Sequence, residues 1–284
     1  MIVLVEIMIK CDFKDSDDPK IQIEASLDLL NQINDLHKQN KTIELDFGSV
    51  NWLLPCSALL LSSRISELTA QGQHIKIIES TNNKVAKFLR EIGFPLGNSS
   101  KKETHCPITH FKGNVNKEIN KVLENINENL HKNFGDGVNY LIGELSDNID
   151  AHSKFTYASL MAQYYPRKRF FDIGVLDNGL TIPGVFDKAK ITFKDDCDAI
   201  RQAMEGVSTK NEGGRGFGLR TSKKVAIEGL NGEMHIYSRA GGILINPKRR
   251  EKYVKLQKNP LIGTLVYMRL YIPKKRLNIY EYTE

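Results

Sequence analysis

The chain has 284 residues, of which 40% are hydrophobic and 26% are charged, and its formal net charge is +6. These proportions are globular, so a largely disordered chain is excluded, and the length fits one large domain or two of ordinary size. Four cysteines without regular spacing argue against a disulfide framework and indicate a reducing compartment. No apolar stretch approaches the roughly 20 residues of a membrane span, so we expect a cytoplasmic protein without a membrane anchor.

The first hundred residues alternate between strand and helix patterns. The expected elements are strands at residues 2–9, 42–47 and 74–78, and helices at residues 25–39, 57–70 and 83–92. The apolar start of the chain therefore predicts a buried strand and not a signal peptide. Strands separated by helices predict a small, mostly parallel sheet with helices packed against it, within a first domain at residues 1–97.

A family resemblance follows from three segments of this region: 45–50, a helix start at Cys56-Ser57, and 71–78. Together they resemble a STAS domain, the fold of anti-sigma factor antagonists, over about residues 40–95. In that family a serine at the helix start can be phosphorylated. By spacing, Cys56 stands at that position here and Ser57 follows it. Ser57 thus has two interpretations, a phosphate acceptor or a helix N-cap.

The second half begins after a polar stretch, and we expect a linker at residues 98–112 and a second domain at residues 113–284. Helices are predicted at residues 116–133 and 138–151. Glu144, Asn148 and His152 are spaced by four residues, so they share one face of the second helix. An amide oxygen is a suitable ligand for Mg²⁺, and a carboxylate one turn away can polarise a water molecule. The alternative is an ordinary polar helix face.

Two further segments carry residues of possible chemical use. A predicted hairpin over residues 158–176 ends in Asp177-Asn178-Gly179, which sets a carboxylate at the edge of a sheet. Such a group can accept a hydrogen bond from an adenine amino group, or it can simply shape a turn. Glycines at positions 214, 216 and 218 precede a helical pattern, and glycines there let backbone N–H groups approach phosphates. Arg215 is either a phosphate contact or a solvated side chain.

The order of these motifs along the chain resembles the GHKL superfamily of ATPases, over about residues 115–273. The ordered set is Glu144-x-x-x-Asn148, Asp177-x-Gly179, Gly214-x-Gly216-x-Gly218-Leu219 and Gly263-Thr264. That superfamily includes DNA gyrase, the MutL repair proteins, histidine kinases and anti-sigma serine kinases. The resemblance implies a two-layer α/β sandwich of the Bergerat type that binds ATP and Mg²⁺.

The resemblance also implies roles for individual residues. Glu144 would be the catalytic base and Asn148 a magnesium ligand. Asp177 would accept from the adenine amino group, and Thr264 would be a second contact on the adenine side. The phosphates would be held by the segment Gly214, Arg215, Gly216, Phe217, Gly218 and Leu219.

A lid is the remaining part that the resemblance implies. Residues 180–212 would form it, and they include Lys210, which could reach a phosphate or lie in solvent. The family usually has a second glycine two residues after Gly179, where this chain has Thr181. His152 stands where anti-sigma serine kinases often carry a histidine, and a capping or core histidine is the alternative.

Three uses of ATP remain open at this point. The favoured one is a magnesium-dependent regulatory protein that hydrolyses ATP slowly and whose lid switches a protein partner. The second is a serine/threonine kinase of the anti-sigma type, and the third is a nucleic-acid-associated ATPase. We expect no phospho-accepting histidine box and no further lysine-bearing domain, which disfavours sensor kinases and gyrase-like enzymes.

Homodimerisation through either half is compatible with the sequence. The basic run at residues 248–252 is either a solvated hairpin or loop, or a patch for nucleic acid or an acidic partner.

Overall fold

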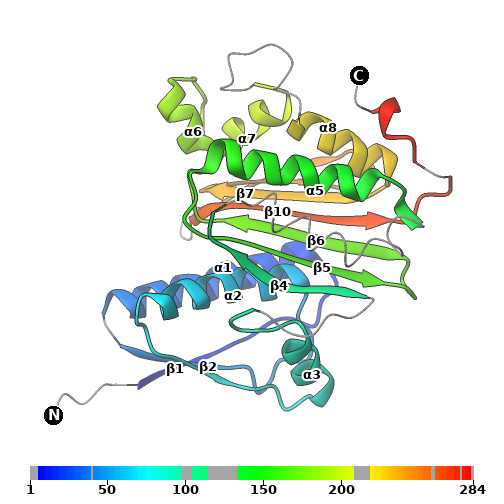
Figure 1. Cartoon of the computed structure of the whole chain (residues 1–284). Helices are drawn as coiled ribbons and strands as arrows, with labels where there is room; N and C mark the ends of the chain where they lie inside the picture. Colours follow the sequence, from blue (N-terminus) through cyan, green and yellow to red (C-terminus); the bar gives the residue numbers. More distant parts are fainter. Residues whose placement is uncertain are drawn as a thin grey trace. The chain divides into compact units, whose positions relative to one another are not determined.

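The computed structural model describes residues 6–39, 41–97, 104–113, 133–207, 218–256, 260–275 and 277–282, except for the side chain of His152. Contacts within the chain divide it into two compact units (Figure 1). The first comprises Met1–Lys101 with Pro107–Thr109, and the second comprises Lys102–Cys106 with His110–Glu284. Among the described residues, no helix is both long enough and apolar enough to cross a membrane.

The first unit is built on a parallel sheet of three strands in the order β1-β2-β3, as the sequence predicts. Its elements are β1 (Glu6–Lys10), α1 (Pro19–Lys38), β2 (Thr42–Asp46), α2 (Pro55–Ala70), β3 (Ile75–Ile78) and α3 (Asn83–Glu91). The central strand β2 carries Ile43 and Leu45, which are completely buried, because a middle strand of a small parallel sheet is covered on both faces.

Both long helices of this unit begin earlier than predicted, because proline defines their first turn. Asp18 caps α1 by accepting a hydrogen bond from the Lys20 N–H at 2.9 Å, and Pro19 follows at the first helical position. The first helical residue of α2 is Pro55, after Leu54. The prediction of Ser57 as the N-cap is therefore wrong, since Ser57 lies inside the helix and is completely buried.

The second unit is built on a sheet of seven strands in the order β4-β5-β6-β10-β7-β8-β9, antiparallel along the ladders from β5 to β9. The strands are β4 (His105–Phe111), β5 (Ala158–Tyr165), β6 (Phe170–Asp177), β7 (Glu233–Arg239), β8 (Gly241–Ile245), β9 (Glu251–Lys255) and β10 (Leu261–Tyr271). The segment predicted as a linker thus includes β4. Its alternating apolar residues Cys106 and Ile108 are buried, which explains why the segment is ordered as a strand.

Helices lie against one face of this sheet (Figure 1). They are α5 (Gly137–Asn148) with a π-helical continuation η1 (Ile149–Ser153), α6 (Ile182–Ala189), α7 (Asp196–Met204), and α8 (Gly218–Lys224) with a π-helical continuation η2 (Val225–Gly229); a short 3₁₀ turn η3 (Ile279–Glu281) lies near the end. The core between helices and sheet contains Leu141 and Leu145 of α5, Val175 of β6 and Met268 of β10. The second unit is therefore a mixed α/β structure whose sheet is antiparallel.

The segment predicted as a mobile lid, residues 180–212, is largely helical where the structure describes it. Ile200 and Met204 of α7 belong to the core, and Arg239 holds Asp196 through its Nε at 2.9 and 3.0 Å. In this structure the apolar face of α7 is thus buried against the sheet, and lid closure stays a prediction. The predicted helix at residues 116–133 lies outside the described residues apart from Asn133.

Candidate functional site

Asp177 is the last residue of β6 and is only 4% exposed. The Gly179 N–H donates to its Oδ1 at 2.8 Å, and the side chain of Ser153 also hydrogen-bonds to the carboxyl group. Burial raises the pKa of Asp177 to about 7, although both hydrogen bonds act in the opposite direction. No cation pairs with Asp177 among the residues that the structure describes. A carboxyl group that is costly to ionise and unpaired is a candidate for ligand recognition.

The turn after Asp177 is fixed against the end of η1. A Cβ atom on Gly179 would lie 2.1 Å from the carbonyl oxygen of Ser153, so only glycine fits there. The Leu180 N–H donates to the same carbonyl oxygen. The side-chain oxygen of Asn178 accepts from the Tyr157 N–H at 2.8 Å. The position of the Asp177 carboxyl group is therefore coupled to the helix that begins with α5.

A polar row crosses the sheet at this level. Thr264 of β10 lies opposite Asp177 of β6, and Ser238 of β7 lies opposite Thr264. The hydroxyl groups of Thr264 and Ser238 are 2.8 Å apart, and the Ile182 N–H donates to Ser238 Oγ at 2.8 Å. In an antiparallel sheet, directly opposed residues point to the same face, so the carboxyl group and the two hydroxyl groups form one row.

Gly263 allows the strands to come together at this row. Its φ angle is +91°, and a Cβ atom there would lie 1.7 Å from the carbonyl oxygen of Asp177. The register between β10 and β7 shifts between Leu261 and Thr264, next to this residue. The glycine therefore brings the backbone of β10 against the end of β6, where Thr264 follows.

The second group of candidate residues lies on α5. Glu144 and Asn148 are half-buried and one helical turn apart. A Cβ atom on Gly218, at the start of α8, would lie 2.2 Å from Glu144 Oε2 and 3.8 Å from Asn148 Nδ2. Burial and then the charge of Glu144 raise the pKa of Tyr140 to about 12, and Tyr140 also hydrogen-bonds to Thr221 of α8. The structure thus brings Glu144, Asn148 and Gly218 together.

The two groups are joined by one helical run. Asn148 ends α5, and η1 continues directly to Ser153, which contacts the Asp177 turn. Ser153 lies nine positions after Glu144, which corresponds to about 13 Å along a helix axis. π-Helical turns within helices are frequent at functional sites, and η1 lies between the two candidate groups.

The other predicted site residues have different outcomes. Leu219 is half-buried in α8 and packs against the core. The backbone of His152 lies in η1, whereas its side chain is outside the description. The remaining phosphate-side predictions lie outside the described residues: Lys210, Gly214, Arg215, Gly216 and Phe217. The sequence analysis did not identify Ser238. Its position could have indicated it, because Ser238 follows Met234 and Ile236 at alternate positions on an apolar strand face.

Few protein atoms in this candidate site could bind a metal ion. Across the described ranges, no group of three or more His, Cys, Asp or Glu side chains could hold a metal ion. The Asn148 side-chain oxygen is the predicted ligand, which suits an ion that keeps most of its water or takes ligands from a substrate. No protein-family model matches the chain, and no match was found among curated proteins.

Proposed function

We propose that this protein is a magnesium-dependent ATP-binding regulatory protein with a Bergerat-type (GHKL) domain at residues 113–284. It would hydrolyse ATP slowly, and the nucleotide state would alter a surface for a protein partner. One observation carries the proposal: the buried, unpaired Asp177 carboxyl group lies opposite the Thr264 hydroxyl group, and a single helical run links it to the Glu144–Asn148 pair. The helix layer on an antiparallel sheet also supports a Bergerat-type sandwich.

The Asp177 end of the site suits an adenine ring. A carboxylate accepts a hydrogen bond from the exocyclic amino group, and the Thr264 hydroxyl group can donate to a ring nitrogen or hold a water. Because Asp177 is buried, a hydrogen bond to its carboxylate form is stronger than it would be in water. An amino donor at this point would offset the cost of ionising the carboxyl group.

The Glu144 end suits the phosphates. The Asn148 oxygen is a hard, neutral donor that fits a hydrated Mg²⁺ ion, which when bound would neutralise phosphate charge. Glu144 can hold and polarise a water molecule for attack on the terminal phosphate. The absence of a side chain at Gly218 lets the Glu144 carboxylate pack directly against the start of α8, where a Cβ atom would lie 2.2 Å from Glu144 Oε2. The axial rise of about 13 Å from Glu144 to Ser153, the residue that contacts Asp177, suits a ligand with two distinct recognition groups.

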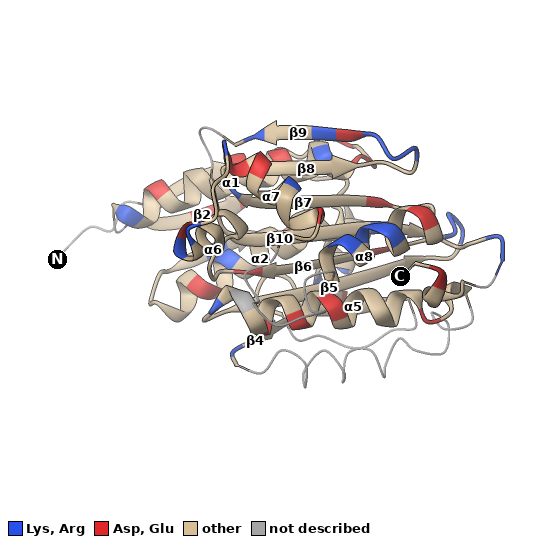
Figure 2. Cartoon of the chain, turned by 90° about the horizontal axis from the view of Figure 1, so that it is seen from above, with Lys and Arg blue, Asp and Glu red and all other residues tan. Residues whose placement is uncertain are grey.

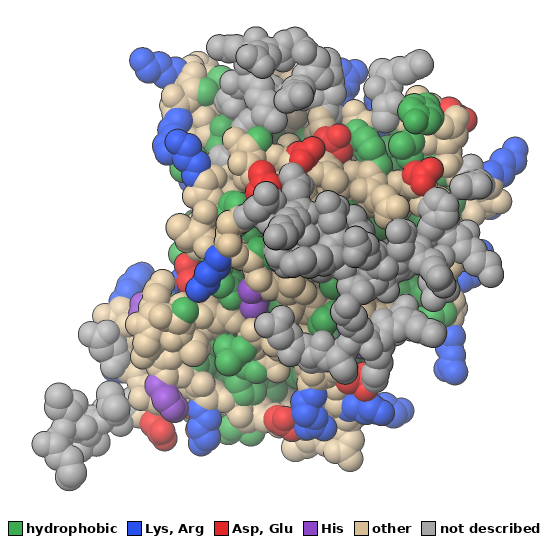
Figure 3. Space-filling view, in the orientation of Figure 1, with side chains coloured by type: hydrophobic (Ala, Val, Ile, Leu, Met, Phe, Trp, Pro, Cys, Tyr) green, Lys and Arg blue, Asp and Glu red, His purple; other side chains and the backbone are tan. Residues whose placement is uncertain are grey.

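Titration calorimetry with ATP and Mg²⁺ tests this proposal. We expect the wild-type protein to bind and Asp177→Ala to lose detectable binding. Acidic side chains lie on the surface over α5 (Figure 3). Asp147→Ala is the matched control, because Asp147 is an exposed carboxylate of that helix. Thermal melting of each variant checks that it folds. Equal affinity of Asp177→Ala and wild type would show that the adenine does not bind at Asp177.

Incubation with γ-labelled ATP separates a switch from a kinase. Release of free phosphate alone supports the switch, whereas a labelled Ser or Thr on a partner supports the kinase. Transfer to Ser57 of the STAS-like region is disfavoured, because that hydroxyl group is completely buried and bonded to Gln22.

A further inference from the structure

Strand β9 forms an open edge of the larger sheet (Figure 2). Its pairing with β8 includes hydrogen bonds from the Leu256 N–H to Ala240 O at 2.8 Å and from the Asn246 N–H to Arg250 O at 3.2 Å. Hydrogen-bonded pairs alternate along an antiparallel ladder, so residues 250, 252, 254 and 256 direct their backbone groups toward β8. Residues 251, 253 and 255 direct theirs outward, and in the described part of the chain no strand pairs with them there.

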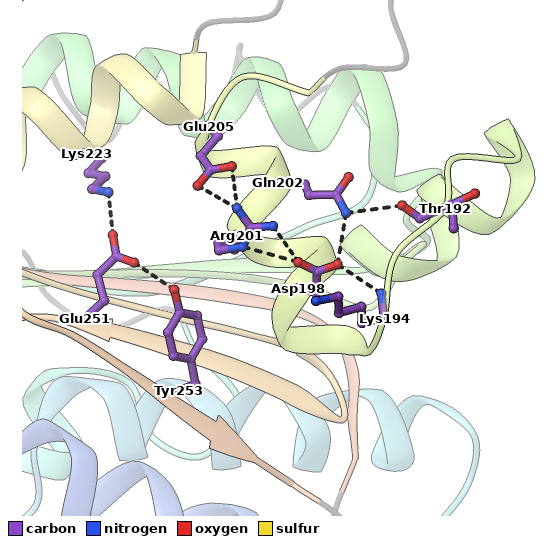
Figure 4. A network of polar contacts seen from close by, with 9 residues as sticks. All are labelled: Thr192, Lys194, Asp198, Arg201, Gln202, Glu205, Lys223, Glu251 and Tyr253. Atoms are coloured by element: carbon purple, nitrogen blue, oxygen red, sulfur yellow. Dashed lines mark hydrogen bonds and ion pairs between the residues drawn. The ribbon is translucent and has the colours of Figure 1, made fainter.

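The side chains of these three outward-bonding residues are held on the helix side of the strand. Glu251 contacts Lys223 Nζ of α8 at 2.5 Å and accepts from the Tyr253 hydroxyl group at 2.9 Å (Figure 4). Lys255 Nζ lies 2.8 Å from Asp195 Oδ2. Tyr253 is nevertheless 44% exposed, which makes it one of the large exposed apolar side chains of the described chain.

We propose that β9 pairs antiparallel with β9 of a second copy of this chain, about a two-fold axis at Tyr253. This register sets Glu251 opposite Lys255 of the second copy, and Lys255 opposite Glu251. The two Tyr253 rings lie opposite each other on the same face. The outward backbone groups of residues 251, 253 and 255 then bond to their counterparts, and the two sheets become continuous.

The charges select this register over its neighbours. Outward groups also face each other when the axis passes through Lys252 or Val254. An axis at Lys252 sets that lysine opposite itself, which is unfavourable. An axis at Val254 sets Lys255 opposite Tyr253 and forms no Glu–Lys pair. With the axis at Tyr253, Lys252 lies opposite Val254, and two opposite-charge pairs form.

Lysines on an edge strand normally prevent random strand pairing, and this strand has two. Lys252 and Lys255 would disfavour pairing with most foreign strands. The exposed cations of the preceding turn would do the same: Lys248, Arg249 and Arg250. The pairing with a second copy is compatible with this protection, because it places Lys252 opposite Val254 and Lys255 opposite Glu251 of the second copy. A five-residue strand pair is a small interface, so the dimer should be weak and dependent on concentration.

Sedimentation equilibrium over a concentration series tests the proposal. We expect a monomer–dimer equilibrium for wild type, and at least a tenfold weaker dimer for Glu251→Lys and for Lys255→Glu, because each creates two like-charge pairs. An equimolar mixture of these two variants should recover association, since both pairs are again of opposite charge. Lys248→Glu changes the net charge by the same amount as Lys255→Glu but lies in the turn, so it should dimerise like wild type.

Two further measurements keep the test independent of variant folding. Tyr253→Pro removes an outward N–H without removing a hydrogen bond to β8, so it should abolish the dimer and retain the thermal stability of the monomer. In wild type, amide exchange at residues 251, 253 and 255 should slow as concentration rises. A wild type that stays monomeric at high concentration, or a variant mixture that does not associate, would overturn the proposal.

Discussion

Each unit of the molecule buries a polar side chain at a position where the sequence suggested function, yet the two groups differ in their partners. The Ser57 hydroxyl group in the first unit lies 3.0 Å from both the main-chain oxygen and Oε1 of Gln22. Asp177 in the second unit is about as deeply buried, but burial raises its pKa to about 7 and no cation compensates in the described residues. Burial alone therefore does not distinguish a structural group from a functional one. The cost of ionisation that the surroundings leave uncompensated is what makes Asp177 the candidate for ligand recognition.

The largest expected effect concerns ATP hydrolysis, for which Glu144 is the proposed base. Glu144→Gln should keep ATP binding and reduce turnover by about 10²–10⁴-fold, because the amide retains the shape of the side chain but cannot act as a base. Single-turnover measurement of phosphate release, together with calorimetry for affinity, separates the two quantities.

The control for this variant is Asp147→Asn, which removes an exposed carboxylate of the same helix. It should change neither turnover nor affinity. If Glu144→Gln hydrolyses ATP at the wild-type rate, Glu144 is a polar surface residue like Asp147, and the contact with Gly218 is only packing.

The next prediction concerns the stability cost of Asp177. Its carboxyl group loses a proton near pH 4 in the unfolded chain and near pH 7 in the folded protein. Between these values the folded state binds the extra proton, so stability falls as the pH rises, and the loss is complete above about pH 7. Asp177→Asn removes this cost and can still accept from the Gly179 N–H. Its gain in stability should be larger at pH 8 than at pH 4, by up to about 4 kcal/mol.

Urea denaturation at pH 4, 6 and 8 measures this difference, and calorimetry on the same variant should show weakened ATP binding. A variant that is more stable and binds less well would identify Asp177 as a residue kept for recognition at the expense of stability. The same stability difference from wild type at every pH would mean that the folded carboxyl group titrates normally.

Sequence patterns predicted much of the architecture. The parallel sheet of the first unit followed from strands separated by helices, and the hairpin of β5 and β6 was predicted at residues 158–176. The helix starts were missed because proline, and not Ser57, defines the first turn of α2. The packing of the apolar face of α7 in the core was not predicted, since the order of motifs along the chain does not reveal packing.

The residue types of the candidate site could be read from the sequence, but their arrangement in space could not. Glu144 and Asn148 could be placed on one face from their spacing alone. The proximity of Gly218 to both depends on how α8 packs against α5, which no local pattern encodes. The row of Asp177, Thr264 and Ser238 depends on the order β6-β10-β7, in which a late strand lies between two earlier ones. Such non-local pairing is the information that periodicity does not contain.

A smaller effect is expected for Ser57, the buried hydroxyl group of the first unit. Ser57→Ala leaves the oxygens of Gln22 without this donor in a buried place, and should reduce the free energy of unfolding by about 1–2 kcal/mol. Magnesium-ATP affinity and turnover should stay at their wild-type values. Urea denaturation and calorimetry measure these quantities. A change in ATP affinity without a change in stability would reverse the assignment of Ser57 as structural.

The smallest expected effect sharpens the comparison within the polar row itself. Thr264→Val preserves the shape and strand preference of the side chain and removes only the hydroxyl group, so ATP affinity should fall about three- to tenfold, or about 1 kcal/mol. Stability should change little, because Ser238 still accepts from the Ile182 N–H. Ser238→Ala should do the opposite, since it leaves that N–H without its acceptor at the start of α6. If calorimetry and melting instead give the two variants the same profile, Thr264 and Ser238 act as one structural pair, and Asp177 alone would contact the base.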